Sequence, residues 1–381
     1  PCGLEVCRGT RFRMPCSLYD CAPSMTRTAR RLLHIVGHML AARAVHVSDG
    51  RLRGEQVLGG SAAAAAEVSD HIAVSPGMTL IGDRAVLDAA FSPPDGKFVL
   101  STNGDKATLW NATTGAAVWT SDSALGSAVF SHTGGQVLTL TSDGNIQVLN
   151  AMTGVWLRTL TLDWACKRPM AAAFSADGGE VLLTCANTFI TSPFVDVRDA
   201  TTGVRRMWVP SGGGGVGGLH SAAFVPGGQL VLTVDWEAFR VWERMPEGRA
   251  NLSREIPLKS YQVGWIAYQG KSAVISPDRQ HVLTADGPQG TATVWDFAAD
   301  VPRMTLERHG DRVNSAEFSP DKGRALTASD DGFAMVWNAT NGLPLMKLVG
   351  HDGPVNSAAF SMDGKRVVTA SNDKTVRVWS V

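Results

Sequence analysis

The sequence predicts an all-β fold, a seven-bladed β-propeller of four-stranded antiparallel blades. Three observations carry this prediction: an internal repeat, an apolar alternation within each copy, and a match between the two ends of the repeated region. The repeat is clearest where "FSPDKGRALTASDDGFAMVWNATNG" (318–342) is followed by "FSMDGKRVVTASNDKTVRVWSV" (360–381). The seven copies have apolar anchors at Phe91, Phe130, Phe174, Phe224, Ile275, Phe318 and Phe360. Subtracting these numbers gives spacings of 39 to 51 residues, close to the period of a propeller blade.

Each copy predicts its elements in the same order. The anchor is followed by a turn that contains Ser or Pro, then by a short run ending in Thr, and then by an acidic turn. A second run follows and ends at or near Trp. The segments "QVLTLTSDGNIQVLN" (136–150) and "LVLTVDWEAFRVWE" (230–243) both have the apolar alternation of paired strands around a turn.

Over about residues 78–381 the chain resembles the WD-repeat family, and the last two copies carry the resemblance best. The sixth copy contains His309, Thr327, Asp331 and Trp337, and the seventh contains Gly350 followed by His351, Thr369, Asp373 and Trp379. The resemblance implies that the His, Thr, Asp and Trp of one copy form a buried hydrogen-bonded relay. Such a relay is physically reasonable because buried polar groups require partners.

Other copies depart from this pattern. Leu149 and Arg198 stand where copies two and three would have Trp, and copy one has Asp83 in place of His. Asp105 also lies one residue closer to Trp110 than the corresponding residues do in copies six and seven. We therefore expect incomplete relays in these blades, although the surviving alternation still predicts their strands.

The ends of the repeated region predict how the ring closes. Val381 follows the third strand of the last blade, which leaves that blade without an outer strand. Upstream, "MTLIGDRAVLDAAFS" (78–92) parallels "MKLVGHDGPVNSAAFS" (346–361). Residues 79–82 are therefore predicted to be the missing outer strand, since propellers avoid open sheet edges.

Residues 1–77 share nothing with the repeats, so we predict an extension, disordered or helical in part, followed by a propeller at 78–381. The chain begins at Pro1, which suggests a fragment or a translation running upstream of the true start. Residues 25–48 contain no acidic residue and resemble a mitochondrial presequence. Targeting by residues 25–53 is therefore an alternative to the predicted cytoplasmic location. Four cysteines, at 2, 7, 16 and 21, suggest zinc only weakly, because their intervals are unusual for a zinc site; we predict no metal site.

Composition excludes several classes of function. Formal net charge is zero, and residues 1–60 hold nine Arg and four acidic residues, so the propeller is mildly acidic. A nucleic-acid footprint requires a basic stripe, which this charge distribution argues against. No apolar run reaches about 18 residues, so no membrane span is predicted. The propeller contains only Cys166 and Cys185, too few for a disulfide scaffold and consistent with a reducing compartment.

No catalytic constellation and no cofactor motif occurs in the sequence, so we do not expect an enzyme. The predicted function is a non-catalytic scaffold, monomeric or part of a hetero-complex, that binds proteins or peptides. The alternative is a C-terminal sensor or regulatory propeller of a larger signalling protein or enzyme. The resemblance implies docking on the face formed by loops before each first strand and between second and third strands. The candidate contact residues are Arg84, Lys106, Arg308, Asp311, Arg312, Asp330, Asp352 and Lys374, with Tyr261, Trp265 and Tyr268 from a long inter-blade loop.

Overall fold

The chain divides into two units, Pro1–Gly59 and Gly60–Val381. The computed structural model describes parts of the second unit: residues 73–122, 127–141, 144–162, 166, 169–185, 193–210, 219, 221–225, 230–234, 238–245, 248, 250–257, 273–285, 290–299 and 301–381. All regular structure in these ranges is β-strand. The described residues contain no helix long and apolar enough to cross a membrane.

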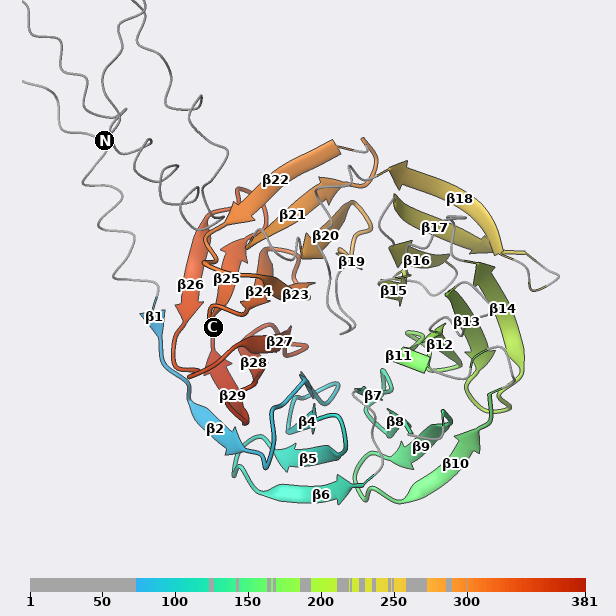
Figure 1. Cartoon of the computed structure of the whole chain (residues 1–381), viewed down its shortest axis with the longest axis horizontal. Coiled ribbons are helices and arrows are strands. Elements are labelled where there is room, and N and C mark those ends of the chain that lie inside the picture. Colours follow the sequence, from blue (N-terminus) through green and yellow to red (C-terminus); the bar gives the residue numbers. More distant parts are fainter. Residues whose placement is uncertain are drawn as a thin grey trace, which may run out of the picture. The chain divides into compact units, whose positions relative to one another are not determined.

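The strands form seven sheets arranged as blades around a ring (Figure 1). Blades one and two are β3 (Asp88–Phe91), β4 (Phe98–Thr102), β5 (Ala107–Asn111), β6 (Ala117–Ser121) and β7 (Ala128–Phe130), β8 (Gln136–Leu140), β9 (Ile146–Asn150), β10 (Trp156–Leu160). Blades three and four are β11 (Pro169–Phe174), β12 (Glu180–Cys185), β13 (Phe194–Asp199), β14 (Arg205–Pro210) and β15 (Ser221–Phe224), β16 (Leu230–Val234), β17 (Ala238–Arg244), β18 (Ala250–Pro257). Blades five and six are β19 (Ala273–Ile275), β20 (His281–Ala285), β21 (Thr291–Asp296), β22 (Val301–Glu307) and β23 (Val313–Phe318), β24 (Arg324–Ser329), β25 (Ala334–Asn338), β26 (Pro344–Leu348). Blade seven has β27 (Val355–Phe360), β28 (Arg366–Ser371) and β29 (Thr375–Ser380) from the C-terminal end, and β2 (Met78–Ile81) from the other end of the ring.

Strand β2 closes the ring, as the sequence predicts. It pairs antiparallel with β29, with Leu80 opposite Val376. The backbone N–H groups of Gly77 and Gly82 extend the pairing by donating to the carbonyls of Val378 and Lys374. Leu80 is only 2% exposed, so the strand is held by apolar burial as well as by its backbone hydrogen bonds.

A short strand outside the predicted propeller is also part of the ring. Strand β1 (Ala73–Val74) pairs in parallel with β26 and makes blade six a five-stranded sheet. The Val349 N–H donates to the Val74 carbonyl just beyond the paired residues. These residues belong to the predicted 1–77 extension, so its last part contacts the propeller. The rest of that extension, up to residue 72, lies outside the described residues.

The hydrophobic core lies between the blades. Each of the seven interfaces between neighbouring blades contains its own cluster of buried apolar side chains. The cluster at the closure, for example, joins Leu80 and Phe91 to Val368. The alternating strands of a blade have two apolar faces, and each face packs on a different neighbour. The closed ring therefore leaves no blade with an uncovered face.

Polar residues of the repeat fix the turns. The residue after the Trp position is Asn or Asp in five blades, and its side-chain oxygen accepts backbone N–H bonds two and three residues later. These residues are Asn111, Asn150, Asp199, Asp296 and Asn338. Asp and Asn favour such turns because their short side chains replace a backbone acceptor. Asp296, which follows Trp295 directly, thus shapes the turn between β21 and β22.

Candidate functional site

The relay of blade seven joins strands β28 and β29, the turn between them and the loop before β27. The Nδ1 atom of His351 lies 2.8 Å from the Asp373 carboxylate, and its Nε2 atom lies 2.7 Å from the Thr369 hydroxyl. The Trp379 indole N–H donates to the same hydroxyl at 2.9 Å. Asp373 also accepts the backbone N–H of Asp352 at 3.1 Å. These bonds hold the loop before β27 against the turn between β28 and β29.

The hydroxyl at the centre of the relay determines the state of the imidazole. An indole N–H is only a donor, so the Thr369 oxygen accepts from Trp379 and has its proton free to donate to Nε2 of His351. The imidazole is then neutral, and its Nδ1–H donates to Asp373. In this arrangement every polar atom of the relay has a partner, as burial requires.

Burial and hydrogen bonding set the titration of this relay. Burial has the largest effect on His351 and lowers its pKa, against the opposing influence of Asp373. Burial would raise the pKa of Asp373, but hydrogen bonds from Thr375 and His351 outweigh it and lower that pKa to about 2. At neutral pH the relay therefore consists of a neutral imidazole and a carboxylate.

Blade six repeats this geometry. His309 lies 2.8 Å from Asp331 and 2.7 Å from the Thr327 hydroxyl, to which Trp337 donates at 2.8 Å. The Gly310 N–H donates to Asp331, as that of Asp352 donates in blade seven. The structure therefore brings together all eight residues to which the sequence assigns a relay.

Part of the relay, with no histidine among the described residues, occurs in three further blades. In each, a Trp indole donates to a Ser or Thr hydroxyl on the neighbouring strand: Trp110 to Ser101, Trp242 to Thr233, and Trp295 to Thr284. The two residues are 9 to 11 positions apart, against 10 in blades six and seven. Strand register rather than fixed spacing identifies the pair, because the hydroxyl lies two residues beyond the residue opposite Trp.

Blade two keeps the hydroxyl and lacks its partner. Leu149 is paired with Val137, which places it at the Trp position, and Thr139 lies at the hydroxyl position. The Thr139 hydroxyl is fully buried and has no hydrogen-bond partner among the described residues. An unpaired buried hydroxyl is destabilising, so the missing indole should lower the stability of this blade.

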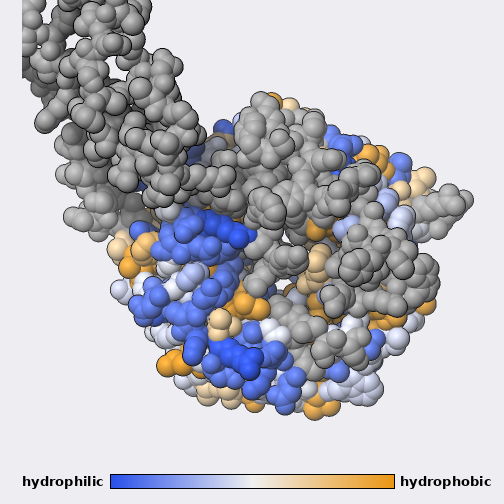
Figure 2. Space-filling view, viewed as in Figure 1, coloured by the Kyte–Doolittle hydropathy of each residue, from blue (hydrophilic) through white to orange (hydrophobic). Residues whose placement is uncertain are grey.

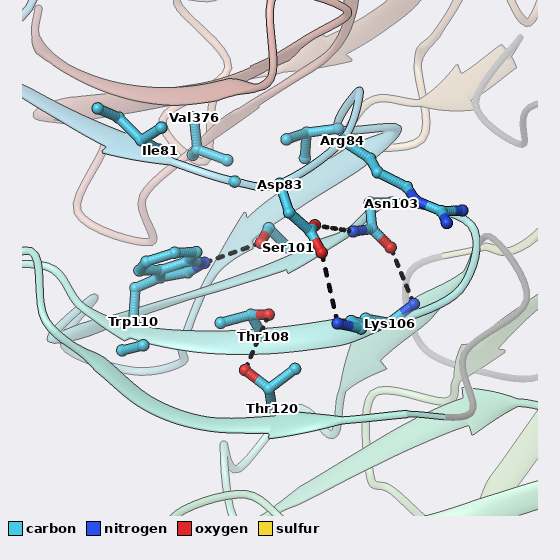
Figure 3. A pocket seen from close by; sticks show the side chains of 13 residues that line it. Ile81, Asp83, Arg84, Ser101, Asn103, Lys106, Thr108, Trp110, Thr120 and Val376 are labelled. Atoms are coloured by element: carbon cyan, nitrogen blue, oxygen red, sulfur yellow. Dashed lines mark hydrogen bonds and ion pairs between the residues drawn. The ribbon is translucent and has the colours of Figure 1, made fainter.

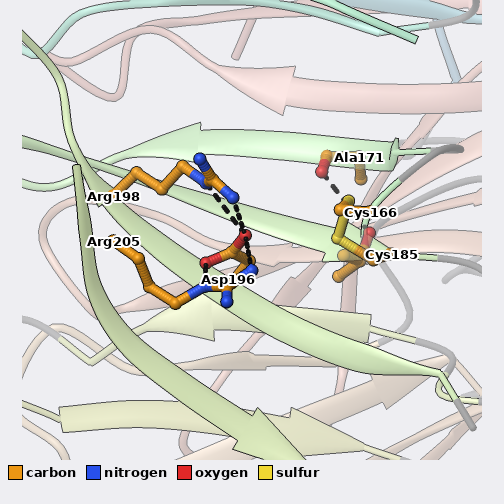
Figure 4. The surroundings of a disulfide bond; sticks show 7 residues. Cys166, Ala171, Cys185, Asp196, Arg198 and Arg205 are labelled. Atoms are coloured by element: carbon orange, nitrogen blue, oxygen red, sulfur yellow. Dashed lines mark hydrogen bonds and ion pairs between the residues drawn. A yellow bond between two sulfur atoms is a disulfide. The ribbon is translucent and has the colours of Figure 1, made fainter. Parts of the chain in front are cut away.

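Blade three replaces the relay with a buried ionic cluster (Figure 4). Arg198 occupies the Trp position opposite Val181, and Leu183 occupies the hydroxyl position. The Arg198 guanidinium donates to the Asp196 carboxylate at 2.8 and 2.9 Å, and Arg205 donates to it at 2.8 and 3.1 Å. The Asp196 side chain is fully buried. The sequence identifies the missing Trp here but does not identify the ion cluster that occupies its place.

Blade one has a different polar arrangement at the same place (Figure 3). Asp83 follows buried Leu80 by three residues, as His351 follows buried Leu348. The Asp83 carboxylate accepts from Asn103 at 2.8 Å and lies 3.4 Å from the Lys106 ammonium. Asp105 pairs with Arg84. Counted between paired residues, the hairpin of β4 and β5 is one residue shorter than that of blade seven, because Ser101 pairs with Thr108 whereas Thr369 pairs with Arg377.

These contacts define an edge that we call the relay rim: the loops before the first strands and the turns between second and third strands in blades six, seven and one. Neighbouring blades are joined along it. Asn314 donates to the Val355 carbonyl, and Asn356 donates to the Val86 carbonyl. The rim is thus continuous from blade six through blade seven to blade one.

The eight predicted contact residues from the repeats all lie on the relay rim. Five of them are exposed: Arg84, Arg308, Asp311, Asp352 and Lys374. The others, Lys106, Arg312 and Asp330, are half-buried. On the face seen in Figure 2, hydrophilic side chains gather over blades six, seven and one. The predicted aromatic contacts Tyr261, Trp265 and Tyr268 lie outside the described residues.

Cys166 and Cys185 form a disulfide that joins the segment before β11 to the end of β12. From the sequence, two cysteines are too few for a disulfide scaffold and consistent with a reducing compartment; the structure differs by pairing them. Both are fully buried. Disulfides are typical of oxidising environments, so this bond does not favour the cytoplasmic location, which stays a prediction.

The comparisons with known proteins agree with this geometry. The family model described as "WD domain, G-beta repeat" matches residues 300–338 and 342–380. Each matched segment covers the outer strand of one blade and three strands of the next. No curated protein matches the chain significantly. The two matched repeats and the ring of seven blades are consistent with a WD-repeat propeller family.

Proposed function

We propose that this protein is a non-catalytic scaffold that binds a partner protein or peptide at the relay rim. The strongest observation in favour of this proposal is the way in which the relays hold the loops of the rim. In blades six and seven, buried relays hold exposed charged loops in fixed positions on a closed ring. A rigid surface of this kind loses little conformational freedom when it binds, which favours affinity.

The charges of the rim indicate the kind of partner. Cations and anions alternate along it, with Arg84 beside Asp105 and Lys106 beside Asp83 in blade one. A mixed surface orients a polar or charged segment and gives specificity rather than burying a large apolar area. The partner is therefore expected to present a polar segment with charges of both signs.

The repeated polar side chains, the types that also serve in catalysis, have structural roles. His309 and His351 are each engaged on both ring nitrogens by their own blade. A general base needs a ring nitrogen that can reach a substrate proton. Since both nitrogens are occupied, we propose that the repeated His, Thr and Asp residues support the surface and do not act on a substrate.

The experiment compares charge reversal on the two faces of the ring. Partners are captured with the full chain and identified, and the complex is then tested with the double variant Arg84→Glu and Arg308→Glu. Both side chains are exposed, so folding should be unchanged, and the complex should be lost. The matched control is Lys97→Glu with Lys365→Glu, two exposed residues in the turns between first and second strands. Loss of the complex only in the control would reject docking at the rim.

A further inference from the structure

A cavity of about 170 Å³ lies between blades seven and one, beneath the relay rim (Figure 3). Its walls include Ser101, Thr108 and Trp110 of blade one and Val376 of blade seven. Asp83 and Lys106 also line it, and both side chains are partly exposed. The cavity therefore combines a buried interior with an entrance that carries both charges.

The cavity coincides with the place of the missing relay imidazole. Trp110 lies opposite Val99, as Trp379 lies opposite Val367, and in each blade the hydroxyl residue follows two positions later. Ser101 thus corresponds to Thr369. Blade one keeps the indole and the hydroxyl of the relay but has an aspartate where blades six and seven have histidine.

The polar groups of the cavity require a ligand that both accepts and donates. Trp110 donates to the Ser101 oxygen at 2.8 Å, so the hydroxyl proton is directed elsewhere, as in the complete relays. A ring nitrogen without a proton would accept it. At the entrance, the Asp83 carboxylate can accept an N–H, the role that Asp373 has toward His351.

This set of groups discriminates between side chains. Guanidinium and ammonium groups have no acceptor for a hydroxyl proton, and a fixed cation would also face the Lys106 ammonium. A phenyl ring has no hydrogen-bonding nitrogen to offer. A neutral imidazole has one donor and one acceptor on opposite sides of a small ring, and the same protein holds such a ring between a hydroxyl and a carboxylate in two other blades.

We propose that the cavity between blades seven and one binds an imidazole ring, supplied by an exposed histidine of the partner. The inserted ring would complete the relay of blade one from outside the chain, with Ser101 donating to one nitrogen and Asp83 accepting from the other. This inference rests on the proposed scaffold function and names one chemical feature of the partner.

The test uses the full chain and 4-methylimidazole, the side chain of histidine, as the probe. Binding is followed at the Trp110 indole N–H in ¹⁵N–¹H spectra, with the signal assigned by its loss in Trp110→Phe. Wild type should show saturable binding. Ser101→Ala should weaken it at least tenfold, and Asp83→His should abolish it because the new side chain fills the cavity from within. The control Lys97→Ala should bind as wild type does.

Two results would overturn the assignment. The first is the absence of saturable binding, or equal binding in the wild type and Asp83→His. The second is binding of methylguanidine or acetamide as tightly as 4-methylimidazole, because the site would then not select an imidazole.

The outcome is separable from that of the proposed function. If 4-methylimidazole does not bind but reversal of Arg84 and Arg308 still abolishes the complex, the scaffold function stands and the imidazole site is rejected. If the probe binds with the expected variant pattern but the rim variants keep the complex, the site stands as a small-ligand site and docking at the rim is rejected.

Discussion

At the scale of single residues, a hydroxyl organises each relay. Thr369 links the indole of Trp379 to the imidazole of His351. The sequence predicts this set in blades six and seven, where the four residue types recur at the same spacing. It does not predict the shorter version in blades one, four and five, because turn length changes the spacing while strand register keeps the contact.

Two threonines at equivalent positions provide a matched test of this role. Thr369→Val removes a hydroxyl with two partners and leaves the Trp379 indole N–H and the Nε2 atom of His351 unpaired, so we expect a loss of about 1–3 kcal/mol in the free energy of unfolding. Thr139→Val removes a buried hydroxyl without a described partner, so it should be neutral or stabilising. Urea denaturation of both variants measures the difference. Equal losses would show that the relay hydroxyl has no special role.

The relay of blade seven should also make stability depend on pH. His351 has a lowered pKa in the folded protein, so its contribution is present above its ordinary value of 6.5 and is lost as pH falls below it. Asp373, lowered from 3.8 to about 2, contributes above pH 4 and loses that contribution as pH falls towards 2. In both windows the unfolded chain binds more protons, so acid destabilises the fold.

The variant Asp373→Asn isolates the second window. From its pKa shift, the carboxylate contributes about 2 kcal/mol near neutral pH. The difference in unfolding free energy between the wild type and Asp373→Asn should therefore shrink as pH falls from about 4 to 2. A difference that stays constant over this range would show that Asp373 titrates alike in both states.

At the scale of elements, blade three shows how a sheet can lose its Trp and remain packed. Its alternation predicts the strands, and Arg198 signals the departure. The charged partners of Arg198 are not residues of the repeat pattern. Asp196 lies two residues before Arg198, and Arg205 lies on the next strand. Sequence spacing alone does not distinguish such a cluster from solvated charges, because burial decides its energy.

Removing the central carboxylate of this cluster should be strongly destabilising. Asp196→Ala leaves the nearly buried guanidinium of Arg198 without its counter-ion. Breaking one partner of a buried pair typically costs about 3–5 kcal/mol. Chemical denaturation checks this value, with Asp199→Asn as a control that removes the charge from a more exposed ion pair with Arg206 and keeps the side-chain oxygen of the turn. A loss at Asp196 no larger than that at Asp199 would contradict the buried cluster.

At the scale of the whole molecule, the number of blades and the closing strand are predictable because both follow from one repeated pattern. The predicted closing residues 79–82 and the observed strand 78–81 differ by a single position. Strand β1 is not predictable in the same way. It is two residues long, pairs in parallel, and has no counterpart among the described residues of the other blades.

The central claim is that a single closed ring carries the relay rim. Thermal unfolding of two shortened chains tests it most directly. A chain starting at Ala73 keeps β1 and β2 and should melt within a few degrees of the full chain. A chain starting at Asp83 lacks β2, exposes the edge of β29 and uncovers the cluster around Leu80. Loss of several kcal/mol should lower its midpoint by on the order of 10 °C, at about 2–4 °C per kcal/mol for a large domain. Equal midpoints for the two chains would contradict closure of the ring by β2.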